Sequence, residues 1–127
     1  NNYRVLEAKN ANEALRILKT ETVTCAILDI HLGEDEQDGI SLGRQISENF
    51  PVPFIYLTAY ENPEIIGRAV STSPYSYLTK PFKNSDLIAS MEIAIRQSAY
   101  FPKRKSFINV NDVVLSYEYV RVCLVAS

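Results

Sequence analysis

An acid, a hydroxyl and an amine stand at the ends of three apolar runs in this chain. Asp29 follows "CAIL", Thr58 follows "FIYL" and Lys80 follows "YSYLT". A carboxylate can accept a phosphoryl group, while a hydroxyl and an ammonium group can stabilise the charge on the phosphoryl oxygens. A divalent cation, usually Mg²⁺, bridges the carboxylate and those oxygens. These residue types predict phosphoryl transfer, provided that the fold brings them together.

The elements that must position these residues alternate along the chain. Strand-like runs cover 3–8, 25–30, 53–60 and 75–82, and helical patterns cover 10–20, 40–50, 62–72 and 84–100. The run at 25–30 is continuously apolar, which is typical of a parallel strand buried on both faces. Alternation of strand and helix predicts an α/β fold with a parallel sheet, whose ligands bind beyond the carboxyl ends of the strands. Such a sheet would bring the three polar residues to one edge.

Three sequence segments carry a resemblance to a known family. "AILDIHL", "IYLTAY" and "YLTKPF", with "DGI" at 38–40, resemble the receiver domain of bacterial two-component response regulators, over residues 3 to about 98. The resemblance implies a flavodoxin-like (CheY-like) doubly wound parallel sheet. It also implies that Asp29 is the phosphoacceptor, that Thr58 is the switch hydroxyl, and that Lys80 pairs with the phosphoryl group.

Further expectations follow from the same resemblance. Tyr77 matches the switch aromatic residue, which turns inward when Thr58 moves. The backbone carbonyl of His31 matches a ligand of Mg²⁺, together with Asp29. The peptide bond between Lys80 and Pro81 would be cis. The sequences "LDIHL" and "IYLTAY" resemble most closely those of bacterial regulators attached to sensor kinases or to LytTR-type DNA-binding domains.

The resemblance is incomplete at the start of the chain. A receiver begins with one more strand and helix, and two acids after that strand hold the metal; in the family's 2-1-3-4-5 strand order the missing strand is central. The chain could be a piece that lacks its start, the C-terminal run at 119–127 could fill the gap, or another chain could donate a strand. In the second case, Ala126 and Ser127 stand where the acids belong. Mg²⁺ binding and phosphorylation of Asp29 would then be weak or lost.

Other residues with chemical potential have plainer interpretations. The acids of the loop after Asp29 are expected to be solvated rather than to replace the missing ligands: Glu34, Asp35, Glu36 and Asp38. Cys25 and Cys123 are far apart in the sequence and predict two buried, reduced thiols, with no spacing that supports a disulfide or a metal site. A hydrolase of the haloacid dehalogenase kind also uses an aspartate nucleophile on an α/β sheet. It would need a second acid two residues after Asp29, and the histidine at position 31 argues against this class.

Composition fits a single globular domain. The chain has 127 residues, 46% hydrophobic and 22% charged, with a net charge of −2. No apolar run approaches the ~20 residues of a membrane span. The small negative net charge gives the chain no strong electrostatic attraction for nucleic acid. The pattern predicts a receiver domain at 1–100, followed by a linker and a β-rich tail at 101–127, in a cytoplasmic protein.

Two functional hypotheses remain open from the sequence. The first is a response-regulator receiver that takes a phosphoryl group from a histidine kinase and acts on an output domain or partner through the face formed by 62–82. It is not an enzyme beyond promoting its own phosphorylation and dephosphorylation. The alternative is a pseudo-receiver that binds or dimerises without phosphorylation. A homodimer or strand swap fits either hypothesis, and nucleic acid would be met only through an output domain outside this chain.

Overall fold

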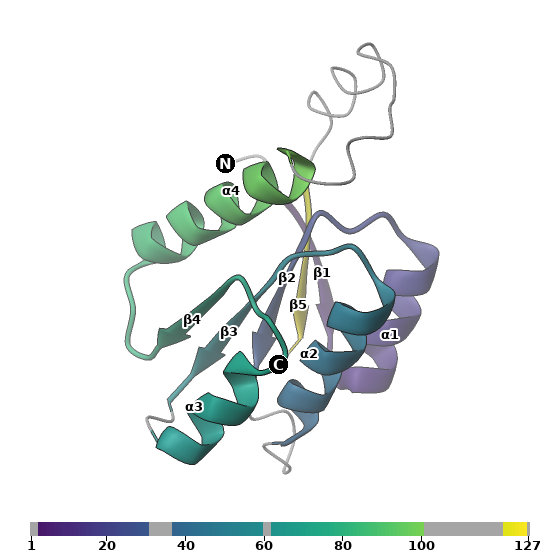
Figure 1. Ribbon diagram of the computed structural model, residues 1–127. Coiled ribbons are helices and arrows are strands. Elements are labelled where there is room, and N and C mark those ends of the chain that lie inside the picture. The colour runs from purple at the N-terminus through teal and green to yellow at the C-terminus, as the bar shows by residue number, and fades with distance from the viewer. Residues whose placement is uncertain (1–2, 31–36, 60–61, 101–120, 127) are drawn as a thin grey trace.

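The computed structural model describes residues 3–30, 37–59, 62–100 and 121–126. These residues form an alternating series of strands and helices that ends in one more strand (Figure 1). In chain order they are β1 (Tyr3–Ala8), α1 (Ala11–Thr20), β2 (Cys25–Asp29), α2 (Gln37–Asn49), β3 (Phe54–Thr58), α3 (Pro63–Val70), β4 (Ser76–Thr79), α4 (Asn84–Tyr100) and β5 (Arg121–Ala126).

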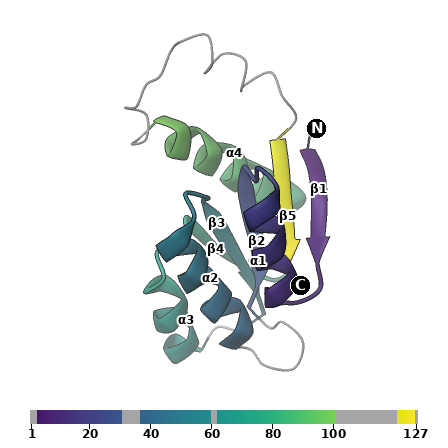
Figure 2. The same ribbon diagram turned by 90° about the vertical axis from the view of Figure 1, so that its right-hand side faces the viewer.

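The strands form one sheet in the order β1-β5-β2-β3-β4, and every neighbouring pair is parallel. Figure 2 shows β5, in yellow, lying between β1 and β2. The order matches the predicted 2-1-3-4-5 arrangement of a flavodoxin-like sheet, with β5 in the place of the family's first strand. The α/β fold predicted from the sequence is therefore confirmed.

Helices cover both faces of the sheet (Figures 1 and 2). Buried residues of α1, α2 and α3 pack with those of the strands in one core cluster, which includes Leu18, Ile46 and Ile65. The second cluster lies under α4 and contains Met91 and Ile95. Because both faces are covered, the first four residues of β2 are all buried, as its unbroken apolar run predicts.

The C-terminal strand lies where the family places its first strand. A segment of the same chain thus fills the central gap, as the second of the three explanations expects. Leu124 pairs with Leu6 on β1 and with Ala26 on β2, and its side chain is fully buried. The central place of the sheet is thus occupied without a strand from another chain.

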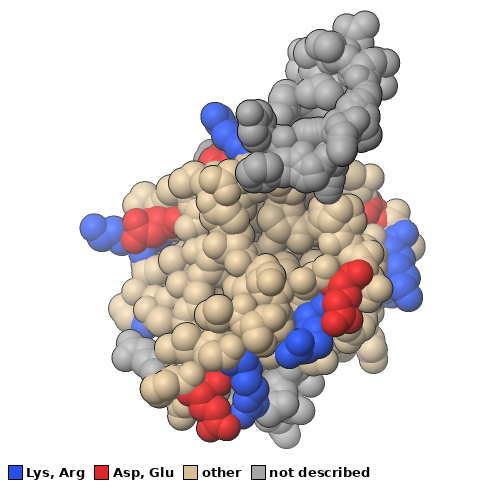
Figure 3. Space-filling model, viewed as in Figure 1, with Lys and Arg blue, Asp and Glu red and all other residues tan. Residues whose placement is uncertain are grey.

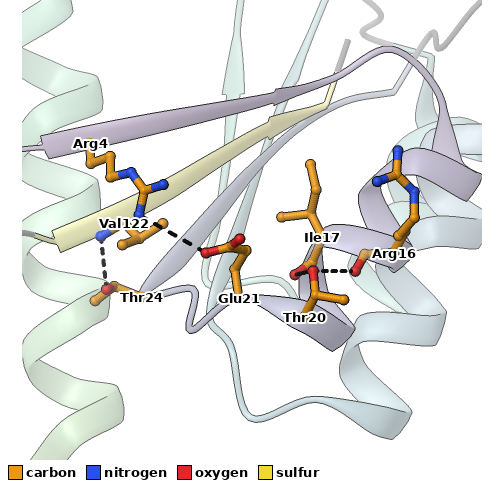
Figure 4. A network of polar contacts seen from close by, with 7 residues as sticks. All are labelled: Arg4, Arg16, Ile17, Thr20, Glu21, Thr24 and Val122. Atoms are coloured by element: carbon orange, nitrogen blue, oxygen red, sulfur yellow. Dashed lines mark hydrogen bonds and ion pairs between the residues drawn. The ribbon is translucent and has the colours of Figure 1, made fainter.

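Thr24 fixes the register at the start of β5 (Figure 4). Its N–H donates to the carbonyl of Val122 at 2.8 Å, and its hydroxyl oxygen accepts from the N–H of Val122 at 3.0 Å. Figure 4 also shows Arg4 of β1 and Glu21 after α1 as an ion pair, with 4.0 Å between nitrogen and oxygen. Both side chains of that pair are exposed, so the two hydrogen bonds between Thr24 and Val122 define the strand's position more firmly.

The ends of the helices follow from local capping. The side chain of Asn10 accepts from the N–H of Glu13 at 2.9 Å, so Asn10 is the N-cap of α1. Asn62 caps α3 in the same way, and Pro63 begins that helix, where its missing N–H costs nothing. These caps confirm the predicted helix starts near 10 and 62.

Some boundaries differ from the sequence prediction. Helix α2 begins at Gln37, within the segment predicted to be a loop, and the N–H of Gly39 donates to the carbonyl of Ile30 at 3.2 Å. Strand β4 has only four residues, because Pro81 cannot donate to a neighbouring strand. Residues 101–120, predicted as the linker and the start of the tail, lie outside the described residues.

Charged side chains are dispersed over the surface. On the face seen in Figure 3, acidic and basic residues mostly stand beside one another, and neither sign forms a continuous patch. Within α3, Arg68 and Glu64 form an ion pair with 3.2 Å between nitrogen and oxygen. Among the described helices, none is long and apolar enough to cross a membrane.

Candidate functional site at the carboxyl edge of the sheet

Asp29 and Lys80 meet at the carboxyl edge of the sheet. Asp29 is the last residue of β2, and Lys80 follows β4 directly. The Nζ atom of Lys80 lies 3.0 Å from Oδ2 of Asp29, while 21% of the Asp29 side chain and 43% of the Lys80 side chain are exposed. A pair this exposed adds little stability. It holds an ammonium group beside a carboxylate oxygen that solvent can still reach.

Thr58 ends the strand between them. It is the last residue of β3, which pairs with β2 on one side and β4 on the other. Its carbonyl accepts from the N–H of Lys80 at 2.8 Å, and its side chain is only 1% exposed. The N–H of Ile30 donates to the carbonyl of Leu57 at 3.2 Å, which joins the ends of β2 and β3. The three residues singled out from the sequence are therefore brought to one edge.

The peptide bond between Lys80 and Pro81 is cis, as predicted. The predicted metal ligand His31 lies outside the described residues, as do Glu34, Asp35 and Glu36, while α2 begins at Gln37.

The described residues do not form a binding site for Mg²⁺. Ala126 ends β5 in register with Leu28, next to the strand that carries Asp29, and its buried methyl group offers no ligand. Across the described ranges, no group of three His, Cys, Asp or Glu side chains could hold a metal ion. Mg²⁺ needs an octahedral set of oxygen ligands, and Asp29 supplies only one carboxylate to it. The donor set that the described residues offer is thus too small for the metal.

Tyr77 lies against a buried hydrogen-bonded tyrosine. Its ring packs edge-on against that of Tyr56, with 6.3 Å between ring centroids, and it is half-buried. The Tyr56 hydroxyl lies 2.7 Å from the hydroxyl of Thr72, which also donates to the carbonyl of Ala69 near the end of α3. Burial raises the pKa of the Tyr56 hydroxyl above its ordinary value. The predicted switch residue is therefore linked to α3 through two buried side chains.

Sequence reasoning missed Thr72 and the relation between the cysteines. Thr72 sits at the end of a helix pattern, and only the fold places it opposite Tyr56. Cys25 and Cys123, described from the sequence as far apart, are partners in register on β2 and β5. The expectation of two buried, free thiols is confirmed, whereas their closeness in the fold was not predicted from the sequence. Their proximity depends on the position of β5, which the residue pattern leaves open.

Gly39 lets α2 approach the end of β2. A Cβ atom at this position would lie 2.5 Å from the carbonyl oxygen of Asp29 and 2.5 Å from Cα of Ile30, and both of those atoms belong to the backbone. We expect Gly39→Ala to lower the free energy of unfolding by about 1–3 kcal/mol, because the helix or the strand end must shift. Urea denaturation followed by circular dichroism measures this loss.

Gly67 provides a matched control for Gly39. It lies within α3, and a Cβ atom there would meet nothing within 4 Å. Gly67→Ala is expected to leave stability unchanged or raise it by up to ~1 kcal/mol, because alanine is the better helix former. Equal effects of the two substitutions would contradict the close approach of Gly39 to β2.

Comparison with known proteins identifies the family. Residues 1–92 match the model of the response regulator receiver domain. The chain belongs to this family. The match ends within α4, so β5 lies beyond the residues that the receiver model matches.

Curated relatives of this receiver domain are response regulators. The chain is 33% identical over 88 residues to a putative NtrX-like response regulator of Rickettsia bellii, an alignment that covers 68% of this chain and 18% of that protein. It is 30% identical over 89 residues to the transcriptional regulatory protein PdtaR of Mycobacterium tuberculosis, covering 70% and 42% of the two chains. The receiver domain thus spans less than half the length of these relatives.

Solved structures agree on the fold. The signal receiver domain of a modulated diguanylate cyclase from Desulfovibrio desulfuricans, described as an example of alternate folding, matches with a TM-score of 0.63 at 30% identity, covering 71% of each chain. The receiver domain of NtrX from Brucella abortus matches with a TM-score of 0.63 at 28% identity, covering 70% of this chain and 75% of that one.

Proposed function

We propose that this receiver domain accepts a phosphoryl group on Asp29 from a phosphohistidine of a histidine kinase, at a low rate. The observation that supports this most directly is the pair of Asp29 and Lys80, with 3.0 Å between Nζ and Oδ2. The family match supports the class of reaction, since the chain belongs to the response regulator receivers.

The chemistry assigns one role to each residue at the edge. A carboxylate oxygen of Asp29 attacks phosphorus, the bond between phosphorus and the imidazole nitrogen breaks, and the imidazole takes up a proton. Lys80 stabilises negative charge on the phosphoryl oxygens, and the hydroxyl of Thr58 donates to one of them. The domain promotes its own phosphorylation in this way and is not otherwise an enzyme.

The low rate follows from the missing metal ligands. Stabilisation of the transferring group by a cation contributes several kcal/mol to reactions of this type. Among the described residues, β5 ends in Ala126 and adds no carboxylate beside Asp29. The ammonium group of Lys80 is then the main positive charge that compensates the phosphoryl oxygens. Phosphorylation that depends weakly on Mg²⁺ is the consequence.

The alternative function is binding without phosphorylation, as in a pseudo-receiver. The same observation favours it: the end of β5 carries alanine where the family places an acid. The segment at 62–82, which was singled out from the sequence, offers exposed apolar groups to a partner protein or output domain, since Val70 at the end of α3 is 55% exposed and Tyr75 before β4 is 37% exposed. That segment serves as the docking surface in either case.

Incubation with acetyl phosphate distinguishes the two functions. Intact mass spectrometry should show slow addition of one phosphoryl group to the wild-type chain, with little change when Mg²⁺ is omitted. Asp29→Asn should abolish the addition, and Asp86→Asn, which changes an exposed acid in the first turn of α4, should not. Absence of any addition to the wild type would support the pseudo-receiver, and addition to Asp29→Asn would refute the assignment of Asp29.

A further inference from the structure

Cys25 and Cys123 stand directly opposite each other on neighbouring strands. Cys25 begins β2, and its partner in the ladder with β5 is Cys123. Paired residues of parallel strands point to the same face, and both cysteines belong to the cluster under α4. Neighbouring strands lie about 4.8 Å apart, a separation within the ~4.4–6.8 Å over which a disulfide joins two Cα atoms.

The two thiols also interact with each other. A hydrogen bond to Cys123 and burial both raise the pKa of the Cys25 thiol, whereas the same hydrogen bond lowers the pKa of the Cys123 thiol. Cys25 is 1% exposed and Cys123 is 2% exposed. In the folded sheet both thiols are free and shielded from solutes, and the pKa of Cys123 is the lower of the two.

The contacts beside the cysteines hold them in register. Thr24 and Val122, the residues immediately before them, are joined by two hydrogen bonds of 2.8 and 3.0 Å. Figure 4 shows the second, from the N–H of Val122 to the Thr24 hydroxyl. A shift of β5 by one residue would turn Cys123 to the other face of the sheet. The two thiols are therefore neighbours only in the register that β5 adopts here.

We propose that Cys25 and Cys123 form a reversible disulfide that fastens β5 between β1 and β2. The bond would be made by exchange with a low-molecular-weight disulfide such as glutathione disulfide, when β5 opens locally and exposes the thiols. Cys25 and Asp29 lie at opposite ends of β2. The disulfide would therefore hold β5 against β2 without moving the carboxyl edge of the sheet.

The exchange proceeds in two steps. The thiolate of one cysteine, written here as Cys123, attacks one sulfur of the small disulfide and releases one thiolate; the order of the two cysteines does not change the product. The thiolate of Cys25 then attacks the sulfur of Cys123 in the mixed disulfide and releases the second thiolate. The protein thiols lose two electrons and two protons, the small disulfide takes up the electrons, and its two thiolates take up the protons.

The test treats the native chain with glutathione disulfide and counts thiols before and after. We expect both thiols to be lost, intact mass to fall by two hydrogen atoms, and a non-reducing digest to yield the peptides of Cys25 and Cys123 linked together. The rate should level off at high oxidant concentration, because opening of β5 limits it. The oxidised chain should melt about 10 °C higher than the reduced chain, since the bond closes a long loop.

Controls separate this bond from other oxidation products. Cys25→Ala and Cys123→Ala should each retain one thiol or carry a glutathione adduct, with no rise in melting temperature. In the wild type, a disulfide-linked dimer, stable adducts on both cysteines, or thiols that stay reduced while the urea-unfolded chain oxidises would each overturn the proposal. The wild-type measurements decide the matter even if a variant fails to fold.

Discussion

Replacing Ala126 and Ser127 with aspartate is expected to raise the Mg²⁺-dependent rate of Asp29 phosphorylation by about 10²-fold. Ala126 is in register with Leu28, so an acid at position 126 would stand beside the end of β2, where Asp29 lies. Two added carboxylates would complete a set of hard oxygen ligands for Mg²⁺. A bound cation that stabilises the transferring group by about 3 kcal/mol corresponds to this change in rate.

The measurement is the initial rate of phosphoryl addition from acetyl phosphate, with and without Mg²⁺. The matched control A126N/S127N adds side chains of the same size without charge and should show no gain. The aspartate variant should unfold more easily in the absence of Mg²⁺, by about 1–3 kcal/mol, because position 126 is fully buried. A rate in Mg²⁺ equal to that of the wild type would contradict the view that missing acids limit this site.

Leu124→Ala is expected to lower the free energy of unfolding by about 2–5 kcal/mol. Leu124 is fully buried in β5, between Leu6 and Ala26, so removal of its side chain leaves a cavity in the core. Leu124→Asp should prevent folding, because it buries a charge without a partner and the total stability of a domain is only about 5–15 kcal/mol.

The control for Leu124 is Val5→Ala on β1. Val5 is 52% exposed, and its loss should change stability by no more than about 0.5 kcal/mol. Urea denaturation followed by circular dichroism compares the variants. If Leu124→Ala cost as little as Val5→Ala, β5 could not be part of the core.

The parts of the fold that sequence reasoning predicted are those encoded locally. The apolar run from Cys25 to Leu28 predicts a strand buried on both faces, and the helical pattern at 10–20 predicts α1. The meeting of Asp29 and Lys80 was also predictable, since parallel strands align their carboxyl ends. These inferences depend on neighbours in the sequence and on one topological rule.

The position of β5 could not be predicted from the residue pattern alone. The run ending at Ala126 has the same strand composition whether it fills the gap in its own sheet or lies elsewhere. The position of β5 in the sheet depends on contacts with β1 and β2, which lie about a hundred residues away along the chain. The pairing of Cys123 with Cys25 is one of these contacts. Two features follow from this position of β5: the proximity of the cysteines, and the small number of described metal ligands at the carboxyl edge.

The measurement that tests the central claim most directly is solution NMR of the uniformly labelled chain. If β5 occupies the middle of the sheet, Leu124 will show inter-strand contacts to both Leu6 and Ala26, and its amide will be strongly protected from hydrogen exchange. A sample mixing labelled and unlabelled chains should show no contacts of β5 between molecules. An unprotected Leu124 amide without contacts to either strand would contradict the account.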